Sequence, residues 1–253
     1  MHRTLTTLIT LVLLTTAAFA QKDVPSAGQT LLQFINQHRG ENGLQPLTVD
    51  PALTQAARAH AMLMSQQKGD AQHQYPGEPD LVARAAQAGA HFHSVSENIA
   101  SGSFRLEDLD RSWMKSDVHR ANILDPKATA VGISVIDNHG SLYIVEDFAQ
   151  SVADLSLDDV EKKAQQQLTD QGIKPAEVAN ARQDARKACE THANDAPNAI
   201  AVMQWDGADF SKLSAAILQN MPQARDHTAA VGACPNKRAG EGFTTYRAAV
   251  LIY

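Results

Sequence analysis

Aromatic side chains and basic clusters are both scarce in this chain of 253 residues. Phe, Trp and Tyr make up only 5% of it, and 22 Lys and Arg stand against 28 Asp and Glu, a formal net charge of −6. Without a basic run, nucleic acid is not an expected partner. A hydrophobic content of 43% with 20% charged residues is ordinary for a globular protein and excludes collagen, a coiled coil and a disordered tail. The length suits one large domain or two small ones.

Long apolar runs are missing beyond the first twenty residues, which excludes a multi-span membrane protein. These twenty residues start with Met1-His2-Arg3, continue through an uncharged stretch and end in Ala18-Phe19-Ala20, a small-x-small cleavage pattern. The uncharged stretch is shorter than the about 20 apolar residues that a membrane span needs. We therefore predict a secretory signal peptide over residues 1–20 and a secreted protein, periplasmic or extracellular, with no membrane span.

Cysteine is limited to Cys189 and Cys234. Two cysteines in an exported protein favour a single disulfide bond between them, because exported proteins meet an oxidising environment. Such a bond would stabilise the fold by about 3–4 kcal/mol in the chain-entropy model. The alternative is a pair of buried free thiols.

The signatures of several enzyme classes are also absent: the chain has no His-Glu-x-x-His, no Gly-x-Ser-x-Gly, no phosphate-binding loop and no Cys-x-x-Cys. Histidine is plentiful, with 10 residues. Imidazole and carboxylate groups together can bind a divalent cation or act as general acids and bases, and spacing alone does not choose between these roles. The candidates between residues 60 and 119 are His60, His73, Glu78, His91, His93, Glu97, Glu107 and His119.

The pattern of apolar residues predicts an α+β fold in two units that divide near residue 151. Asp50-Pro51 marks one helix start, with Asp as the N-cap and Pro in the first position. In residues 27–150 we expect helices around 31–35 and over 51–64, 81–88 and 106–124, strands over 131–136 and 142–148, and an otherwise irregular stretch over 70–96. In residues 151–253 we expect helices over 157–168, 176–189 and 210–218 and strands over 200–204, 229–234 and 244–253.

A short internal similarity links the two units. Ala128-Thr129-Ala130-Val131-Gly132-Ile133 resembles Thr228-Ala229-Ala230-Val231-Gly232-Ala233, and each precedes a β-rich run that contains a tyrosine. This similarity raises the hypothesis that residues 151–253 are a degenerate repeat of the first unit.

Three segments of the first unit carry a more specific signal. They are the apolar helix over 53–64 that leads to His73, the run Glu97-Asn98-Ile99-Ala100, and the run Trp113-Met114-Lys115-Ser116-Asp117-Val118-His119-Arg120-Ala121-Asn122-Ile123-Leu124. With the strand-like runs from Val131 and Tyr143 behind them, they resemble, in order and spacing, the CAP superfamily of cysteine-rich secretory, antigen 5 and pathogenesis-related 1 proteins. The resemblance covers residues from about 27 to 150 and is to the bacterial secreted branch.

This resemblance implies an α-β-α sandwich with a small antiparallel sheet and an open cleft lined by two histidines and acidic residues. His73, Glu97 and His119 match the family positions, whereas Ser116 stands where animal-type members have a second acid, and Ser96 where a glycine is usual. We therefore predict a site of His73, Glu97 and His119 for a divalent cation, Zn²⁺ or Mg²⁺, because two histidines and one carboxylate leave coordination positions open. Asn98 and Ser116 are predicted to orient it by hydrogen bonds.

Each of these residues also has a structural interpretation. His60 lies on the apolar stripe of the 53–64 helix and is expected to be a core histidine, and Trp113 a core residue. Glu97 could instead anchor a loop by accepting backbone N–H groups. His91 and His93 could add a metal ligand near Glu97, but an exposed strand edge is favoured.

The function that fits best is a secreted, non-catalytic ligand-binding module with a cation-competent cleft, whose partner is a small molecule, a lipid or a cell-envelope component. One alternative is an enzyme, a metal- or His/Glu-assisted hydrolase of envelope peptides or polymers, in which Ser116 near His119 would be the nucleophile. Another is a structural, envelope-associated protein that makes its contacts through residues 151–253. Because one fold hosts many functions, the fold alone does not decide among them.

Overall fold

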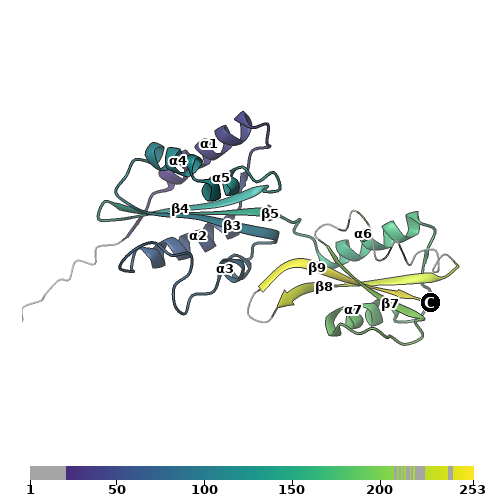
Figure 1. The fold of residues 1–253 in the computed structure, drawn as a ribbon. Helices are drawn as coiled ribbons and strands as arrows, with labels where there is room; N and C mark the ends of the chain where they lie inside the picture. Colours follow the sequence, from purple (N-terminus) through teal and green to yellow (C-terminus); the bar gives the residue numbers. More distant parts are fainter. Residues whose placement is uncertain are drawn as a thin grey trace, which may run out of the picture.

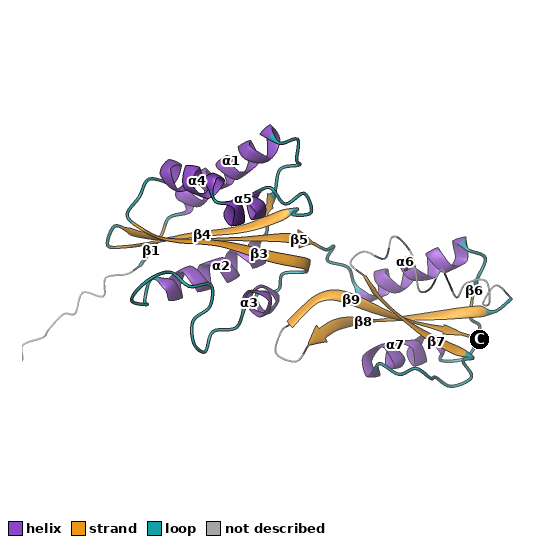
Figure 2. Cartoon of the chain, in the orientation of Figure 1, coloured by secondary structure: helices purple, strands orange, loops and turns teal. Residues whose placement is uncertain are grey.

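The computed structural model describes residues 21–207, 210, 212, 214, 217, 219, 226–238 and 242–253. They form two units, each with a sheet covered by helices on both faces (Figures 1 and 2). The predicted α+β class is confirmed. The predicted signal peptide over 1–20 and most of the predicted helix over 210–218 lie outside the described residues. Within the described residues, no helix is long and apolar enough to cross a membrane.

The first unit is built around a five-stranded sheet in the order β1-β4-β5-β3, with β2 also paired to β4. Strand β5 is antiparallel to both of its neighbours, β3 and β4, and β2 runs parallel to β4. Figure 1 shows α1, α4 and α5 on one face of this sheet and α2 and α3 on the other. The elements are β1 (Lys22–Asp23), α1 (Pro25–Glu41), β2 (Thr48–Val49), α2 (Pro51–Met64), α3 (Leu81–Gln87), β3 (Phe92–Gly102), α4 (Leu106–Lys115), α5 (Asp117–Ile123), β4 (Ala130–Asn138) and β5 (Ser141–Ser151).

Helix α2 begins where the sequence predicts it and packs very closely on the sheet. The Asp50 side chain accepts hydrogen bonds from the backbone N–H groups of Ala52 and Leu53, at 2.8 and 3.0 Å, which caps the helix. A Cβ atom placed on Gly132 of β4 would lie 2.2 Å from the backbone carbon of Leu53. Glycine at this position therefore lets the helix backbone approach the strand.

Two predictions for the first unit are wrong. The single helix predicted over 106–124 is two helices, because Ser116 between them has an extended backbone with φ −88° and ψ 122°. The stretch predicted as irregular over 70–96 ends in a regular strand, because β3 begins at Phe92 and pairs with β5 over its whole length apart from one irregularity between Phe92 and Ser94. The break and the strand both help to form the candidate site.

The second unit has a four-stranded sheet in the order β6-β8-β9-β7. Its helices differ from prediction at one point: the helix expected from 176 starts at Ala181, because Lys174 and Pro175 pair with β8 and Asn180 has a left-handed φ of 63°. The predicted strand over 200–204 extends to Gly207. The elements are α6 (Leu157–Asp170), β6 (Lys174–Pro175), α7 (Ala181–Thr191), β7 (Ala201–Gly207), β8 (Thr228–Arg238) and β9 (Gly242–Ile252).

The two sheets have the same strand order. Strands β2, β4, β5 and β3 of the first correspond in order and direction to β6, β8, β9 and β7 of the second. Gly232 repeats the role of Gly132, since a Cβ atom there would lie 2.0 Å from the backbone nitrogen of Arg186 in α7. The repeat stays a hypothesis, and this common topology is an observation in its favour.

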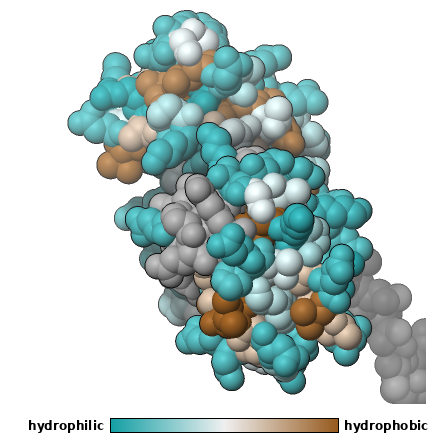
Figure 3. Space-filling view, turned by 90° about the vertical axis from the view of Figure 1, so that its right-hand side faces the viewer, coloured by the Kyte–Doolittle hydropathy of each residue, from teal (hydrophilic) through white to brown (hydrophobic). Residues whose placement is uncertain are grey.

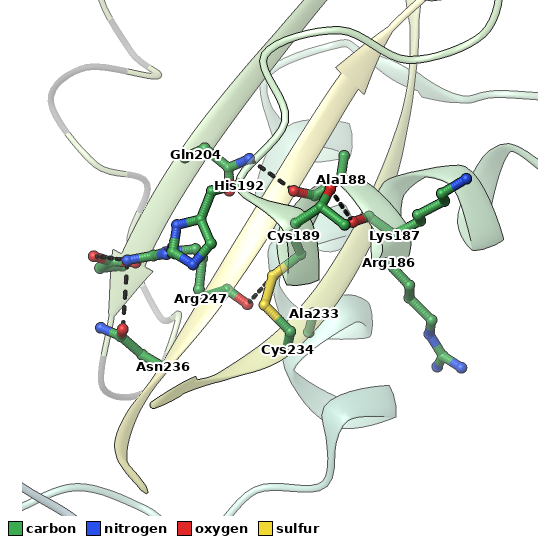
Figure 4. The surroundings of a disulfide bond; sticks show 12 residues. Arg186, Lys187, Ala188, Cys189, His192, Gln204, Ala233, Cys234, Asn236 and Arg247 are labelled. Atoms are coloured by element: carbon green, nitrogen blue, oxygen red, sulfur yellow. Dashed lines mark hydrogen bonds and ion pairs between the residues drawn. A yellow bond between two sulfur atoms is a disulfide. The ribbon is translucent and has the colours of Figure 1, made fainter. Parts of the chain in front are cut away.

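The predicted disulfide bond between Cys189 and Cys234 is present. It joins the C-terminal part of α7 to β8 (Figure 4), and both cysteines pack among small apolar residues between that helix and the sheet. The bridge closes a sequence separation of 45 residues. It therefore holds together the helix and the sheet of a unit smaller than the first.

We expect the double variant Cys189→Ala/Cys234→Ala to lose about 3–4 kcal/mol of unfolding free energy, because the bridge restricts the unfolded chain. Chemical denaturation of the wild type with and without reductant measures this, with hydrogen exchange of α7 and β8 peptides to assign the loss to the second unit. The double variant should show no response to reductant. Equal midpoints for the oxidised and reduced wild type would contradict the prediction.

The visible surface at the second unit's end carries no single large apolar region among its described residues. In Figure 3, hydrophobic side chains occur as separate brown spots between hydrophilic ones. Across the described chain, large exposed hydrophobic residues include Val49, Val82, Val118 and Ile200, which come from different elements. Single exposed apolar residues of this kind are normal on a protein surface in contact with water.

Candidate functional site

The candidate site lies along β3, an outer strand of the first sheet. Neighbouring side chains of a strand point to opposite faces, so Glu97 and Asn98 project to different sides of the sheet. Glu97 contacts the loop and helix on the α2 and α3 side, whereas Asn98 contacts α5. One strand therefore positions both halves of the site.

His73 and Glu97 form a directly hydrogen-bonded pair. Nδ1 of His73 lies 2.7 Å from Oε1 of Glu97, and since an ionised carboxylate only accepts, the imidazole is the donor. The His73 side chain is 62% exposed and that of Glu97 only 2%. The ring of His73 is thus exposed to solvent, while its Nδ1 is hydrogen-bonded to a buried carboxylate.

Arg84 of α3 is a member of this site that sequence reasoning missed. Its guanidinium donates to Oε2 of Glu97 at 2.5 Å and to the backbone oxygen of His73 at 3.0 Å. Arg84 is itself buried, so its charge offsets that of the buried Glu97. Both carboxylate oxygens of Glu97 are consequently engaged by the protein.

His60 is fully buried, as its place on the apolar stripe of α2 predicts. Its Nδ1 lies 2.7 Å from Oε1 of Glu78, and its Nε2 is 3.9 Å from Oε2 of Glu97. Glu78 also accepts the backbone N–H of Tyr75 at 3.0 Å. His60 and Glu78 therefore form the inner wall of the site.

His119 lies on the other side, on the short helix α5. Its Nδ1 is 2.9 Å from Oγ of Ser116, and its ring stacks on Trp113 with centroids 5.7 Å apart. Asn98 donates to the backbone oxygen of His119 at 3.3 Å. Burial, and then the nearby His73, lower the pKa of His119 from its usual value. Trp113 is a core residue as predicted.

Two acids that follow each other in β5 lie behind the site. Glu146 and Asp147 are both buried, and the register sets Asp147 opposite Glu97 and Glu146 opposite Asn98. Burial raises the pKa of Glu146 to about 8. Burial and the neighbouring Glu97 raise the pKa of Asp147 well above its usual value. Burial therefore favours the protonated form of both carboxyl groups.

The remaining candidates lie elsewhere. His91 faces the second unit, where its Nδ1 is 3.7 Å from Oδ1 of Asp154 and its ring meets Tyr246 at a centroid distance of 6.2 Å. His93 is exposed near the start of β3, in agreement with the favoured strand-edge interpretation. Glu107 lies in the first turn of α4 and pairs with Arg105.

The three predicted metal ligands are not arranged as a ready metal centre. In the part of the chain that the structure describes, no group of three or more His, Cys, Asp or Glu side chains could hold a metal ion together. Glu97 is bound to His73 and Arg84, so the two histidine rings are the donors left to face a ligand. Cation binding stays a prediction.

Comparison with known proteins gives one family for the first unit. The model of the cysteine-rich secretory protein family, CAP, matches residues 32–148. The uncharacterized protein YkwD of Bacillus subtilis strain 168 is 30% identical over 128 residues, which are 51% of this chain and 49% of that protein. The chain thus spans about half the length of this curated relative.

Two solved structures each match about half of the chain. An outer surface protein from Borrelia burgdorferi is 18% identical and covers 52% of this chain and 98% of its own, with a TM-score of 0.49. An extracellular protein containing an SCP domain from Bacillus anthracis is 23% identical and covers 50% of this chain and 41% of its own, with a TM-score of 0.46. By the family match, residues 32–148 of this chain are a CAP domain.

Proposed function

We propose that this CAP domain is an exported binding module in which His73 and His119 hold a divalent cation through their Nε2 atoms. The observation that carries the proposal is the 2.7 Å hydrogen bond between Nδ1 of His73 and the buried Glu97 carboxylate. Histidines that bind metals commonly donate Nδ1–H to such a carboxylate, which fixes the tautomer and leaves the Nε2 lone pair free. Glu97 then orients the His73 ring and does not coordinate the metal itself.

The donor chemistry favours Zn²⁺ over Mg²⁺. Imidazole nitrogens suit zinc, whereas magnesium prefers oxygen ligands in octahedral geometry. Two imidazoles leave at least two positions of a tetrahedral zinc open. An acidic group of a small molecule, a lipid or a cell-envelope polymer could complete the coordination, which links cation binding to ligand binding.

Export is part of the proposal. The first twenty residues have the charge and apolar pattern of a signal peptide, and the two cysteines are paired. Relatives of similar fold are described as an outer surface protein and an extracellular protein. Together these features support a protein that works outside the inner membrane.

Calorimetric titration of metal-stripped protein with Zn²⁺, Mg²⁺ and Ca²⁺ tests the proposal. We expect one Zn²⁺ per chain, little or no binding of the other two ions, and at least about a 100-fold loss of Zn²⁺ affinity in His73→Ala/His119→Ala. The matched control is His93→Ala, because His93 is exposed on the same unit but lies outside the site. Binding should weaken below about pH 6, where histidines take up protons.

Two results would contradict the proposal. Absence of Zn²⁺ binding by the wild type would remove the cation from the function, and the search would move to apolar and envelope-polymer ligands. Equal binding by the wild type and the double variant would place the metal at another site.

A hydrolase is the second candidate, because Ser116 Oγ lies 2.9 Å from His119 Nδ1, the contact that a nucleophile and its base need. An activity-based fluorophosphonate probe tests this. Labelling of the wild type that is lost in Ser116→Ala would establish the nucleophile. Absence of labelling in folded wild type would reject a serine hydrolase.

We also propose that the second unit is a divergent copy of the first that lacks the candidate site. When the two sheets are aligned on Gly132 and Gly232, their strand registers give the corresponding residues. Gln204 of the second unit then corresponds to Glu97, and Trp205 corresponds to Asn98. Neither residue can replace the Glu97 carboxylate. One Zn²⁺ per chain supports this proposal, whereas two ions, with one retained in the His73/His119 variant, would contradict it.

A further inference from the structure

Glu146 and Asp147 are buried acids with no catalytic or binding role in the function proposed above. They are 1% and 0% exposed. Being consecutive in β5, they point to opposite faces of the sheet, as Asn98 and Glu97 do on the neighbouring strand. In the register of β3 and β5, Asp147 is opposite Glu97 and Glu146 is opposite Asn98.

Asp147 supports the half of the site that contains His73. No donor group among the described residues reaches either of its carboxylate oxygens. Asp147 instead lies directly opposite Glu97, so the two carboxyl groups share one face of the sheet. Two ionised carboxylates side by side repel each other, whereas a protonated Asp147 donates a hydrogen bond to Glu97 and restricts the carboxylate that holds His73.

Glu146 supports the other half. Its carboxyl group hydrogen-bonds to the side chain of Asn98. Asn98 in turn donates to the backbone oxygen of His119 and accepts from Nδ2 of Asn122, at 3.3 and 2.9 Å. Glu146 is thus connected through Asn98 to α5, the helix that carries His119.

The second unit shows that a sheet of this topology forms without these acids. Gly132 and Gly232 are opposite Asp147 and Ala249, respectively, so these two positions correspond. Glu146 corresponds in the same way to Ala248. The second unit therefore has two alanines where the unit with the candidate site buries two acids. Burying a carboxyl group carries a desolvation cost, so the pair is better explained by the candidate site than by the sheet.

We propose that Glu146 and Asp147 are positioning residues for the two histidines, Asp147 through Glu97 to His73 and Glu146 through Asn98 to His119. This inference rests on the proposed role of His73 and His119. Each acid acts through the cross-strand neighbour it contacts, and neither touches the ligand.

The test uses full-length protein and the variants Asp147→Ala, Asp147→Asn, Glu146→Ala and Glu146→Gln, with Ser134→Ala as control for a buried polar group on β4 of the same sheet. The first readout is the imidazole ¹⁵N chemical shift of His73 and His119, which reports which ring nitrogen carries the proton. The second is Zn²⁺ affinity by calorimetry. Denaturation of each variant confirms that it is folded.

We expect Asp147→Ala to change the tautomer signature of His73 and to weaken Zn²⁺ binding by about 10–100-fold, the usual effect of removing an outer-shell partner. Asp147→Asn should keep the wild-type tautomer signature of His73 and the wild-type Zn²⁺ affinity, because an amide N–H can replace the protonated carboxyl as donor to Glu97. Glu146→Ala should affect His119 in the same way, with restoration by Glu146→Gln. Ser134→Ala should leave both histidines unchanged.

Wild-type histidine signatures in both folded alanine variants would overturn the inference. So would an Asp147→Asn variant that behaves like Asp147→Ala, since the amide retains the donor. If an alanine variant fails to fold, the amide variants alone decide, because each must keep the wild-type signature. If the wild type binds no Zn²⁺, only the proposed function fails, and the ¹⁵N signatures still decide the positioning roles.

Discussion

Replacing Arg39 by methionine is expected to lower the free energy of unfolding by about 4 kcal/mol. Arg39 is 1% exposed, and its guanidinium donates to the backbone oxygens of Gln45, Ile123, Asp125 and Ala128 at 2.8 to 3.0 Å. Methionine fills similar space but leaves these carbonyl groups without their donor. Each buried acceptor left unsatisfied costs about 1–3 kcal/mol before the structure relaxes.

Arg39 also links distant parts of the first unit. It lies near the end of α1, while Ile123 ends α5 and Ala128 precedes β4. The variant should therefore loosen α5, which carries His119, and weaken Zn²⁺ binding as well. Denaturant titration and hydrogen exchange of α5 peptides measure the two effects.

The matched control is Arg58→Met, because Arg58 is exposed on α2 and pairs with the exposed Asp23. An exposed ion pair contributes about 0–1 kcal/mol, so this variant should stay within that range of the wild type. A loss below about 1 kcal/mol in Arg39→Met, similar to the control, would mean that the four carbonyl groups find other donors and that the prediction is wrong.

Some of the fold is predictable because the signals are local. Asp50-Pro51 starts α2 as expected, since the cap and the first-position proline act within one turn. The β4–β5 hairpin is predicted from β-rich runs on either side of a polar turn. The disulfide follows from the count of two cysteines in a chain that is predicted to be exported.

Strand β3 is not predictable in this way, although it is the center of the site. A half-buried strand is recognised by alternation of apolar and polar residues. In β3 two adjacent polar residues, Glu97 and Asn98, are both buried on opposite faces, so the alternation disappears. The partners that make this burial tolerable come from other parts of the chain, since Arg84 of α3 donates to Glu97 and Asn122 of α5 donates to Asn98.

Other site features depend on tertiary contacts in the same way. Arg84 lies in an alanine-rich helix, and no local pattern indicates that its guanidinium reaches Glu97. The break at Ser116 interrupts a run with good helical periodicity, and it turns α5 so that His119 meets both Ser116 and Trp113. The family resemblance names His73, Glu97 and His119, but only the structure shows that the Glu97 carboxylate is buried and bonded to Arg84 while the His73 side chain is exposed.

Adding a single methyl group at Gly132 or Gly232 is expected to destabilise the corresponding unit by about 3 kcal/mol or more. The new Cβ atom would lie 2.2 Å from backbone atoms of α2 in the first case and 2.0 Å from backbone atoms of α7 in the second. Backbone cannot move aside as a flexible side chain can, so the helix must shift away from the sheet. Overpacking of this kind costs about 1–3 kcal/mol and occasionally more.

The control for Gly132→Ala is Gly28→Ala in α1, where the atom nearest to the added Cβ would belong to the Ile133 side chain, at an ordinary contact distance of 3.7 Å. Alanine is the better helix former by about 1 kcal/mol, so this variant should be as stable as the wild type or slightly more stable. Hydrogen exchange separates the units: Gly132→Ala should expose α2 and β4, and Gly232→Ala should expose α7 and β8. Because the two glycines hold corresponding places in the two sheets, similar losses in both units are expected if the second is a copy of the first. Tolerance of alanine at Gly232 alone would show that α7 does not pack on its sheet as α2 does, and would count against the repeat.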